Sequence, residues 1–132
     1  MLGAILHGMN ALPELPAAVK PIVEAARTTV RAVAPHAEEV PCAGKKPSSP
    51  SMMWKLVRYA VDGQVVVTIG TFTKHSSMFF ARGAEIDDGG GPLEGTGNKL
   101  RYITLRTATD AKRATVKDVL IKAFALAAST DR

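Results

Sequence analysis

The sequence predicts an α+β domain with two layers, in which an antiparallel meander sheet of four to six strands carries N- and C-terminal helices on one face. Two observations lead to this fold class. Apolar residues recur at three- and four-residue steps near both ends of the chain, as in amphipathic helices. Between those segments the apolar pattern becomes alternating or continuous and is interrupted by turn residues, as in strands. Because each helix has one apolar stripe to bury, both should pack on the same face of the sheet.

The length and composition are typical of a single domain. A chain of 132 residues, 46% of them hydrophobic, can bury one core. We expect that core to extend from about residue 16 to residue 128, after a loosely ordered N-terminal segment over residues 1–14.

The first helix is predicted to run from Pro16 to the residues just before Pro35. Pro21 fits its first turn, where the missing N–H costs little, and Pro35 ends it because the residue before a proline disfavours the helical conformation. A short turn is expected over residues 36–40, and a loop over residues 41–51, which contain several prolines and serines. The apolar stripe of this helix comprises Val19, Ile22, Val23, Ala26, Val30 and Val33.

Strands are predicted between the helices at residues 54–61, 64–72, 76–82 and 101–107. Asp62-Gly63 forms a two-residue hairpin turn between the first two strands. Alternation places Val65, Val67 and Ile69 on one face of the second strand.

In the fourth strand, alternation directs Ile103 and Leu105 inward. The residues directed outward are Tyr102, Thr104 and Arg106. Most aromatic side chains of the chain are expected in the core, and Tyr102 is the exception.

The last helix has the clearest apolar stripe, formed by Val116, Val119, Leu120, Ala123, Phe124 and Ala127. Thr115 is followed three residues later by Asp118, a spacing that predicts a capping box at the start of this helix.

The net charge of +5 is concentrated in the middle of the chain. Residues 45–113 carry eleven basic and six acidic side chains, whereas residues 1–44 carry three and four. A basic surface favours anionic partners through long-range attraction. It is also typical of a solvated surface that has no specific partner.

The single Cys42 excludes an intramolecular disulfide framework and is typical of a reducing compartment, so we expect a cytoplasmic protein. We expect neither a signal peptide nor a membrane partner, since no apolar run approaches the ~18 residues that a membrane span needs. No pattern of nucleophile, base and orienting group is recognisable around Cys42 or elsewhere in the sequence. We therefore expect a protein that is not an enzyme.

A glycine-rich loop before the fourth strand is the first candidate site. Gly95 and Gly97 can present backbone N–H groups to an anion, and Lys99 and Arg101 add positive charge. This is not a P-loop, because Leu100 rather than Ser or Thr follows the lysine. The alternative is a long hairpin connection in which the glycines supply turn conformations.

Carboxylates in the same loop form a second candidate, a site for a hard metal ion. The predicted ligands are His75, Glu85, Asp87, Asp88 and Glu94. Their spacing matches no defined metal-binding loop, and the alternative is a solvated turn that begins at the two aspartates.

A third candidate is the sheet face that carries Tyr102 and Arg106. An aromatic and basic face of this kind can bind single-stranded nucleic acid through base stacking and phosphate contacts.

The segment from Met78 to Arg106 also resembles a known family. The residues similar to the YdhG-like family of bacterial domains, grouped with the frataxin-like YjbR/CyaY superfamily, are FFARGAEI at 79–86, Asp88, LEGTGNK at 93–99 and Arg101. The resemblance extends from about Pro21 to Ala127 and implies a small α+β domain with helices on an antiparallel sheet. Some members are described as frataxin-like iron chaperones, so it also implies iron as a ligand.

We therefore expect a small binding domain for a metal ion, a small anion or a protein partner. Nucleic-acid binding on a basic sheet face is the alternative.

Overall fold

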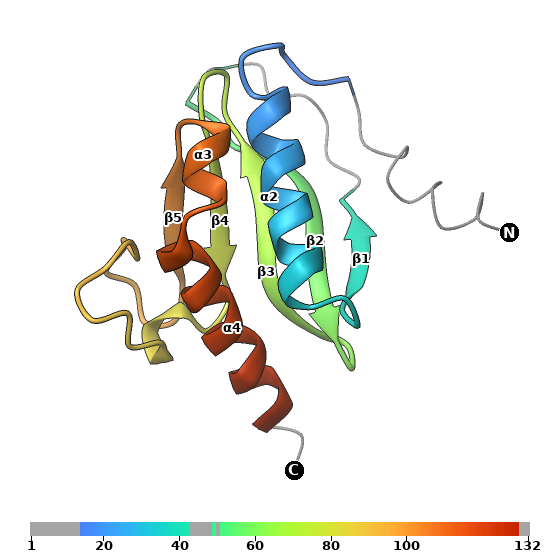
Figure 1. The fold of residues 1–132 in the computed structure, drawn as a ribbon. Coiled ribbons are helices and arrows are strands. Elements are labelled where there is room, and N and C mark those ends of the chain that lie inside the picture. The colour runs from blue at the N-terminus through green and yellow to red at the C-terminus, as the bar shows by residue number, and fades with distance from the viewer. Residues whose placement is uncertain (1–13, 43–48, 50, 130–132) are drawn as a thin grey trace, which may run out of the picture.

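The computed structural model describes residues 14–42, 49 and 51–129 of the chain. Almost all of the predicted N-terminal segment 1–14 lies outside these ranges. The fold is the predicted α+β arrangement, with one open antiparallel sheet in the order β1-β2-β3-β4-β5 (Figure 1). The strands are β1 (Glu38–Pro41), β2 (Trp54–Val61), β3 (Gln64–Thr71), β4 (Ser76–Phe80) and β5 (Arg101–Leu105). The helices are α2 (Lys20–Val33), the 3-10 turn η1 (Gly83–Glu85), α3 (Ala108–Ala111) and α4 (Ala114–Ser129).

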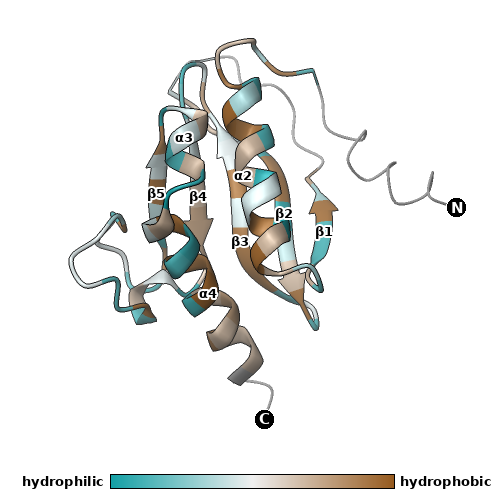
Figure 2. Ribbon diagram, in the orientation of Figure 1, coloured by the Kyte–Doolittle hydropathy of each residue, from teal (hydrophilic) through white to brown (hydrophobic). Residues whose placement is uncertain are grey.

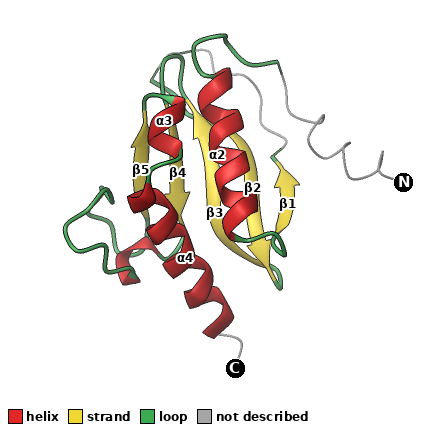
Figure 3. Cartoon of the chain, viewed as in Figure 1, coloured by secondary structure: helices red, strands yellow, loops and turns green. Residues whose placement is uncertain are grey.

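The helices α2, α3 and α4 lie on the same side of the sheet (Figure 3). Between the two layers is the hydrophobic core, to which α2, the strands β2 to β5, α3 and α4 contribute. The predicted stripe of the last helix is confirmed, because all six of its residues are buried. The helix α2 is amphipathic, and Figure 2 shows hydrophilic and hydrophobic residues alternating around its turns. Among the described residues, no helix is both long and apolar enough to cross a membrane.

The predicted start and end of the first helix are close to those observed. The helix α2 begins at Lys20, after a turn over residues 17–19, and Pro21 lies in its first turn. The residues of its predicted stripe are buried except for Val33, which is partly buried. Ala34 caps the helix by donating its N–H to the Val30 carbonyl, and Pro35 follows.

The short turn expected over residues 36–40 was wrong, because Glu38–Pro41 forms the edge strand β1. Glu39 pairs with Tyr59 and Val40 pairs with Arg58 of β2. Pro41 ends the strand, a position where a missing N–H is tolerated at a sheet edge. Four residues with two glutamates carry a weak strand pattern, and pairing with β2 decides their conformation.

The prediction that Val65 shares a face with Val67 and Ile69 was also wrong. Tyr59 pairs with Val67 while Ala60 pairs with Val65, so Val66 is an extra residue in β3. Such a bulge interrupts the alternation. Val66 and Val67 are therefore both buried, and Val65 turns to the other face with 38% of its surface exposed.

The predicted capping box at Thr115 and Asp118 does not form, because α4 begins at Ala114 and contains both residues. The capping box lies instead at Thr107 and Asp110, which have the same spacing and begin α3. Thr107 follows β5 with an extended backbone (φ −140°, ψ 163°), as an N-cap residue requires. The Thr-x-x-Asp pattern therefore occurs twice in the sequence. Only the copy that follows the end of β5 forms a capping box.

Candidate functional site

The predicted anion loop is closed by its own arginine. The Arg101 guanidinium donates to the Gly97 carbonyl at 2.6 Å and to the Leu100 carbonyl at 2.9 Å. Gly95 has a φ of +117°, which favours glycine, and the Arg101 and Tyr102 side chains pack against it. The Lys99 carbonyl accepts from the Ala84 N–H, which joins the loop to η1. Carbonyl oxygens of the loop therefore point toward Arg101 and accept its hydrogen bonds. Arg101 was expected to bind an anion, but its guanidinium is bound by its own loop.

The five predicted metal ligands do not form one site, and that prediction was wrong. His75 precedes β4, whereas the four carboxylates follow it, at the opposite end of the strand. The described residues contain no group of three or more His, Cys, Asp or Glu side chains that could hold a metal ion.

The carboxylates of this loop bind protein groups instead. Glu85 accepts from Arg82 at 2.6 Å, and this partner lowers the pKa of the glutamate. Asp87 accepts from the Gly89 N–H at 2.9 Å, and Asp88 accepts from the Leu93 N–H at 2.8 Å. They act as turn residues, which is the alternative that the sequence left open.

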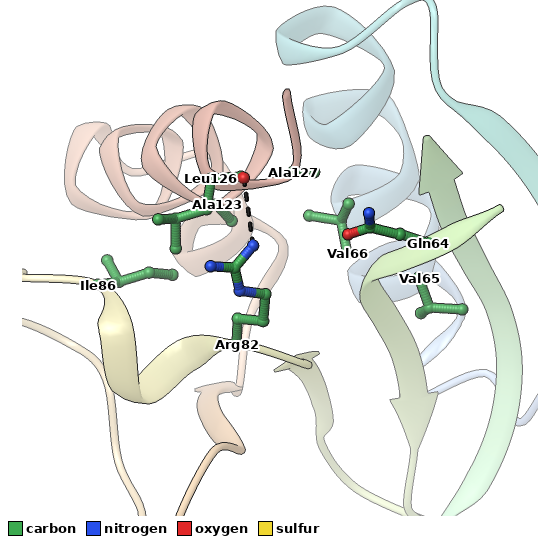
Figure 4. A pocket seen from close by; sticks show the side chains of 8 residues that line it. All are labelled: Gln64, Val65, Val66, Arg82, Ile86, Ala123, Leu126 and Ala127. Carbon is green, nitrogen blue, oxygen red and sulfur yellow. Dashed lines mark hydrogen bonds between the residues drawn. The ribbon is translucent and has the colours of Figure 1, made fainter. Parts of the chain in front are cut away.

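A small hollow beneath α4 is too small for a ligand. It has a volume of about 10 Å³, which is room for roughly one water molecule. Figure 4 shows Arg82 pointing from the end of β4 toward α4, where its guanidinium donates to the Leu126 carbonyl at 3.2 Å. Arg82 therefore holds η1 against the C-terminal part of α4, and we assign it a structural role.

The sheet face opposite the helices, which we call the open face, gathers aromatic and basic side chains. Ile103 and Leu105 are buried on the helix side, so alternation places Tyr102 on the open face, as predicted. The strand pairing brings Arg58, Thr68, Phe79 and Tyr102 into one row across four strands. The rings of Phe79 and Tyr102 lie with their centroids 5.7 Å apart, at the distance of an aromatic pair.

A second aromatic row lies at the other end of the open face. The Phe72 N–H donates to the His75 carbonyl at 2.8 Å, and the two rings are stacked with centroids 4.4 Å apart. Because Ser76 pairs with Leu105, the register places Arg106 beside His75. Burial and the positive charge of Arg106 lower the pKa of His75, so this ring is neutral at pH 7.

Between the two aromatic rows lies a row whose residues on β3, β4 and β5 have small side chains. The strand pairing aligns Lys55, Gly70, Ser77 and Thr104 in that row. A Cβ atom added at Gly70 would lie 2.5 Å from the Met53 sulfur, which shows that Met53 packs over the sheet there. Gly70 and Ser77 are accordingly buried, so the middle row is covered while the rings on either side of it stay partly exposed.

The charges of the open face favour an anion. Lys55, Arg58 and Arg106 are exposed on it. Glu38 and Glu94 are the described carboxylates at its two margins, where they pair with Ala60 of β2 and Tyr102 of β5. Lys55 and Arg58 lie on β2 and Arg106 follows β5, so the exposed cations flank the two central strands and give the face a positive potential.

Sequence reasoning missed part of this face, since it assigned Phe72 and Phe79 to the core. Phe79 lies between Met78 and Phe80, both of which are completely buried. In a strand, a residue between two core residues faces away from the core. The alternation of side chains along this strand could therefore have predicted that Phe79 faces away from the core.

A buried polar cluster was also missed. Glu39 of β1 accepts a hydrogen bond from the Tyr59 hydroxyl at 2.6 Å and one from Arg27 at 3.3 Å, and Arg31 lies 3.4 Å from the same carboxylate. Burial raises the pKa of Glu39, but these donors and positive charges outweigh it and hold the pKa below its ordinary value. The cluster lies between α2 and the sheet, and it joins β1 to the helix.

Comparison with family models, with curated proteins and with solved structures gives no match to this chain. The resemblance to the YdhG-like family stays a prediction from the Met78–Arg106 segment.

Proposed function

We propose that this protein is a non-enzymatic binding domain that holds single-stranded nucleic acid on its open face. The observation that carries the proposal is the Phe79–Tyr102 ring pair, which lies in one row with the exposed Arg58. A cytoplasmic location, as the single cysteine predicts, is compatible with such a ligand.

Stacking is the first source of affinity. Each base that stacks on an aromatic side chain contributes about 1–3 kcal/mol, with little dependence on sequence because every base has a π-face. The second ring pair, Phe72 and His75, lies four residues along β4 from Phe79, a separation of about 13 Å at ~3.3 Å per residue. Two bases separated by a spacer can therefore stack on the two pairs, one on each side of the middle row.

Phosphate contacts are the second source of affinity. Lys55, Arg58 and Arg106 are exposed beside the rings. Each phosphate that a cation neutralises releases counterions, so binding weakens with salt by a slope of about 0.7 per contact on single strands. The net charge of +5 adds a long-range attraction that raises the association rate.

The predicted metal and small-anion functions have less support. The five metal ligands do not meet, and Arg101 is bound by carbonyls of its own loop. On the open face, by contrast, the rings and cations are already exposed or partly exposed, so a ligand can reach them without a rearrangement of the chain.

The test is the binding of a fluorescein-labelled oligothymidine 15-mer, measured by fluorescence anisotropy at several salt concentrations. We expect Phe79→Ala and Tyr102→Ala each to weaken binding by about 5- to 150-fold, the equivalent of one stacked base. The matched control is Ile121→Ala, since Ile121 is 56% exposed but lies on α4, on the other side of the sheet. If the wild-type protein does not bind at low salt, or if both ring variants bind like the control, the proposal is wrong.

A further inference from the structure

A groove of about 360 Å³ runs along the outer edge of β5. One wall is formed by Pro92 and Glu94 of the preceding loop, and the other by Arg113 and Thr115 at the start of α4. Its volume falls in the range of ligand-binding clefts, and its lining is a mixture of polar and apolar groups. Thr104 and Arg106 line the groove and also belong to the open face, so the two surfaces are continuous.

The backbone of β5 presents one open hydrogen-bonding position in this groove. Tyr102 exchanges both backbone hydrogen bonds with Glu94, at 2.8 and 2.9 Å. The Arg106 N–H, four residues on, donates to the Asp110 carboxylate at 2.9 Å. Alternate residues of an antiparallel strand direct their backbone groups to the same edge. The Thr104 N–H, midway between these two, therefore faces the groove, and no described residue accepts from it.

Arg113 is held at the groove by the Asp110 carboxylate, with its Nε and Nη2 at 3.1 and 2.9 Å from one oxygen. The other oxygen of Asp110 accepts from the backbone of Arg106 and Thr107. Four donors thus offset the charge of this acid. The Arg113 side chain remains 62% exposed, which leaves part of its guanidinium available to a second anion.

We propose that the β5 groove binds one phosphate group of the nucleic-acid strand that lies on the open face, an inference that rests on the proposed function. Arg113, Arg106 and the Thr104 N–H supply the donors. Glu94 repels the phosphate from the Tyr102 end of the groove and so places it toward Arg113. The strand crosses from the Tyr102 ring over the edge of β5, where the groove receives its backbone.

The salt dependence of oligothymidine binding tests this inference with a matched pair of variants. Arg113→Gln removes the groove cation, and Lys117→Gln removes one exposed cation of α4 that does not line the groove. Both change the net charge by the same amount. We expect Arg113→Gln to make the salt slope less steep by about 0.7, the value for one phosphate contact, and Lys117→Gln to leave it unchanged.

The outcomes separate the inference from the proposed function. If the wild-type protein binds and the two variants have the same slope, the groove binds no phosphate of the strand and the inference is wrong. If the wild-type protein does not bind at all, the proposed function itself has failed. Arg106→Gln should also reduce the slope, but Arg106 belongs to both the open face and the groove, so Arg113→Gln is the variant that decides for the groove. Circular dichroism checks that each variant is folded, which we expect because exposed ion pairs contribute little stability.

Inorganic phosphate alone, titrated in a calorimeter, distinguishes the source of the anion. If the groove binds a phosphate of the nucleic-acid strand, free phosphate should give weak or undetectable heat, because the open face contributes most of the affinity. If the free ion binds, and Arg113→Gln abolishes that binding without affecting the oligonucleotide, the groove is a site for a small phosphate and the inference is overturned.

Discussion

The Tyr59→Phe substitution isolates one hydrogen bond of the buried Glu39 cluster. Tyr59 is 1% exposed, and its hydroxyl donates to the Glu39 carboxylate at 2.6 Å. Phenylalanine keeps the ring in place and removes only this donor. A hydrogen bond to a charged group contributes about 1.5–3 kcal/mol, so we expect the variant to lose about 2 kcal/mol of unfolding free energy at pH 7.

The effect should depend on pH through the ionisation of Glu39. Because the folded pKa of this group is held below the ordinary value of 4.5, its interactions stabilise the protein fully above that value. The stabilisation is lost as the pH falls through the folded pKa, where the carboxyl becomes neutral. The difference between wild type and Tyr59→Phe should therefore be largest near pH 7 and smaller below the folded pKa. Burial and the neighbouring glutamate raise the pKa of Tyr59, so its hydroxyl stays protonated over this range.

Urea denaturation followed by circular dichroism measures the loss. With a slope of about 2 kcal/mol per molar urea, a loss of about 2 kcal/mol lowers the midpoint by about 1 M. Tyr102→Phe is the matched control, since it removes a hydroxyl from a tyrosine of the open face. A Tyr59→Phe midpoint within about 0.2 M of the control at pH 7 would refute the reasoning. A loss of the same size at pH 7 and at a pH below the folded pKa of Glu39 would refute it too.

Two further predictions concern glycine packing and helix capping. Gly83→Ala should destabilise the protein by about 1–3 kcal/mol in thermal unfolding, because the new Cβ would lie 2.8 Å from the Arg101 backbone nitrogen. Gly97→Ala, with nothing within 4 Å, is its control, and equal stability of the two variants would contradict the prediction. Thr107→Ala should cost about 1 kcal/mol by removing the oxygen that accepts from the Asp110 N–H at 3.1 Å, whereas Thr115→Ala should have little effect. Equal losses for these two threonines would argue that the capping box lies elsewhere.

Periodicity in the sequence predicted the two long helices and four of the five strands, because burial on one face leaves a local pattern; it did not predict the short helix α3 or η1. Local periodicity alone was enough to predict the buried stripe of the last helix. It was also enough to predict the inward positions of Ile103 and Leu105. The same alternation placed Tyr102 on the open face. The Asp62-Gly63 turn was also local, and both residues have the positive φ that such a turn requires.

What the sequence by itself determined is therefore the type and order of most elements and the class of the fold. Only the tertiary structure decided which side chains meet. The bulge at Val66 depends on how β2 pairs with β3, and β1 exists because β2 offers it an edge. The alignment of Arg58 with Phe79 and Tyr102, and the contact of Glu39 with Tyr59, depend on strand register across segments far apart in the chain. Register is set by pairing between strands, and a single sequence records that pairing only weakly.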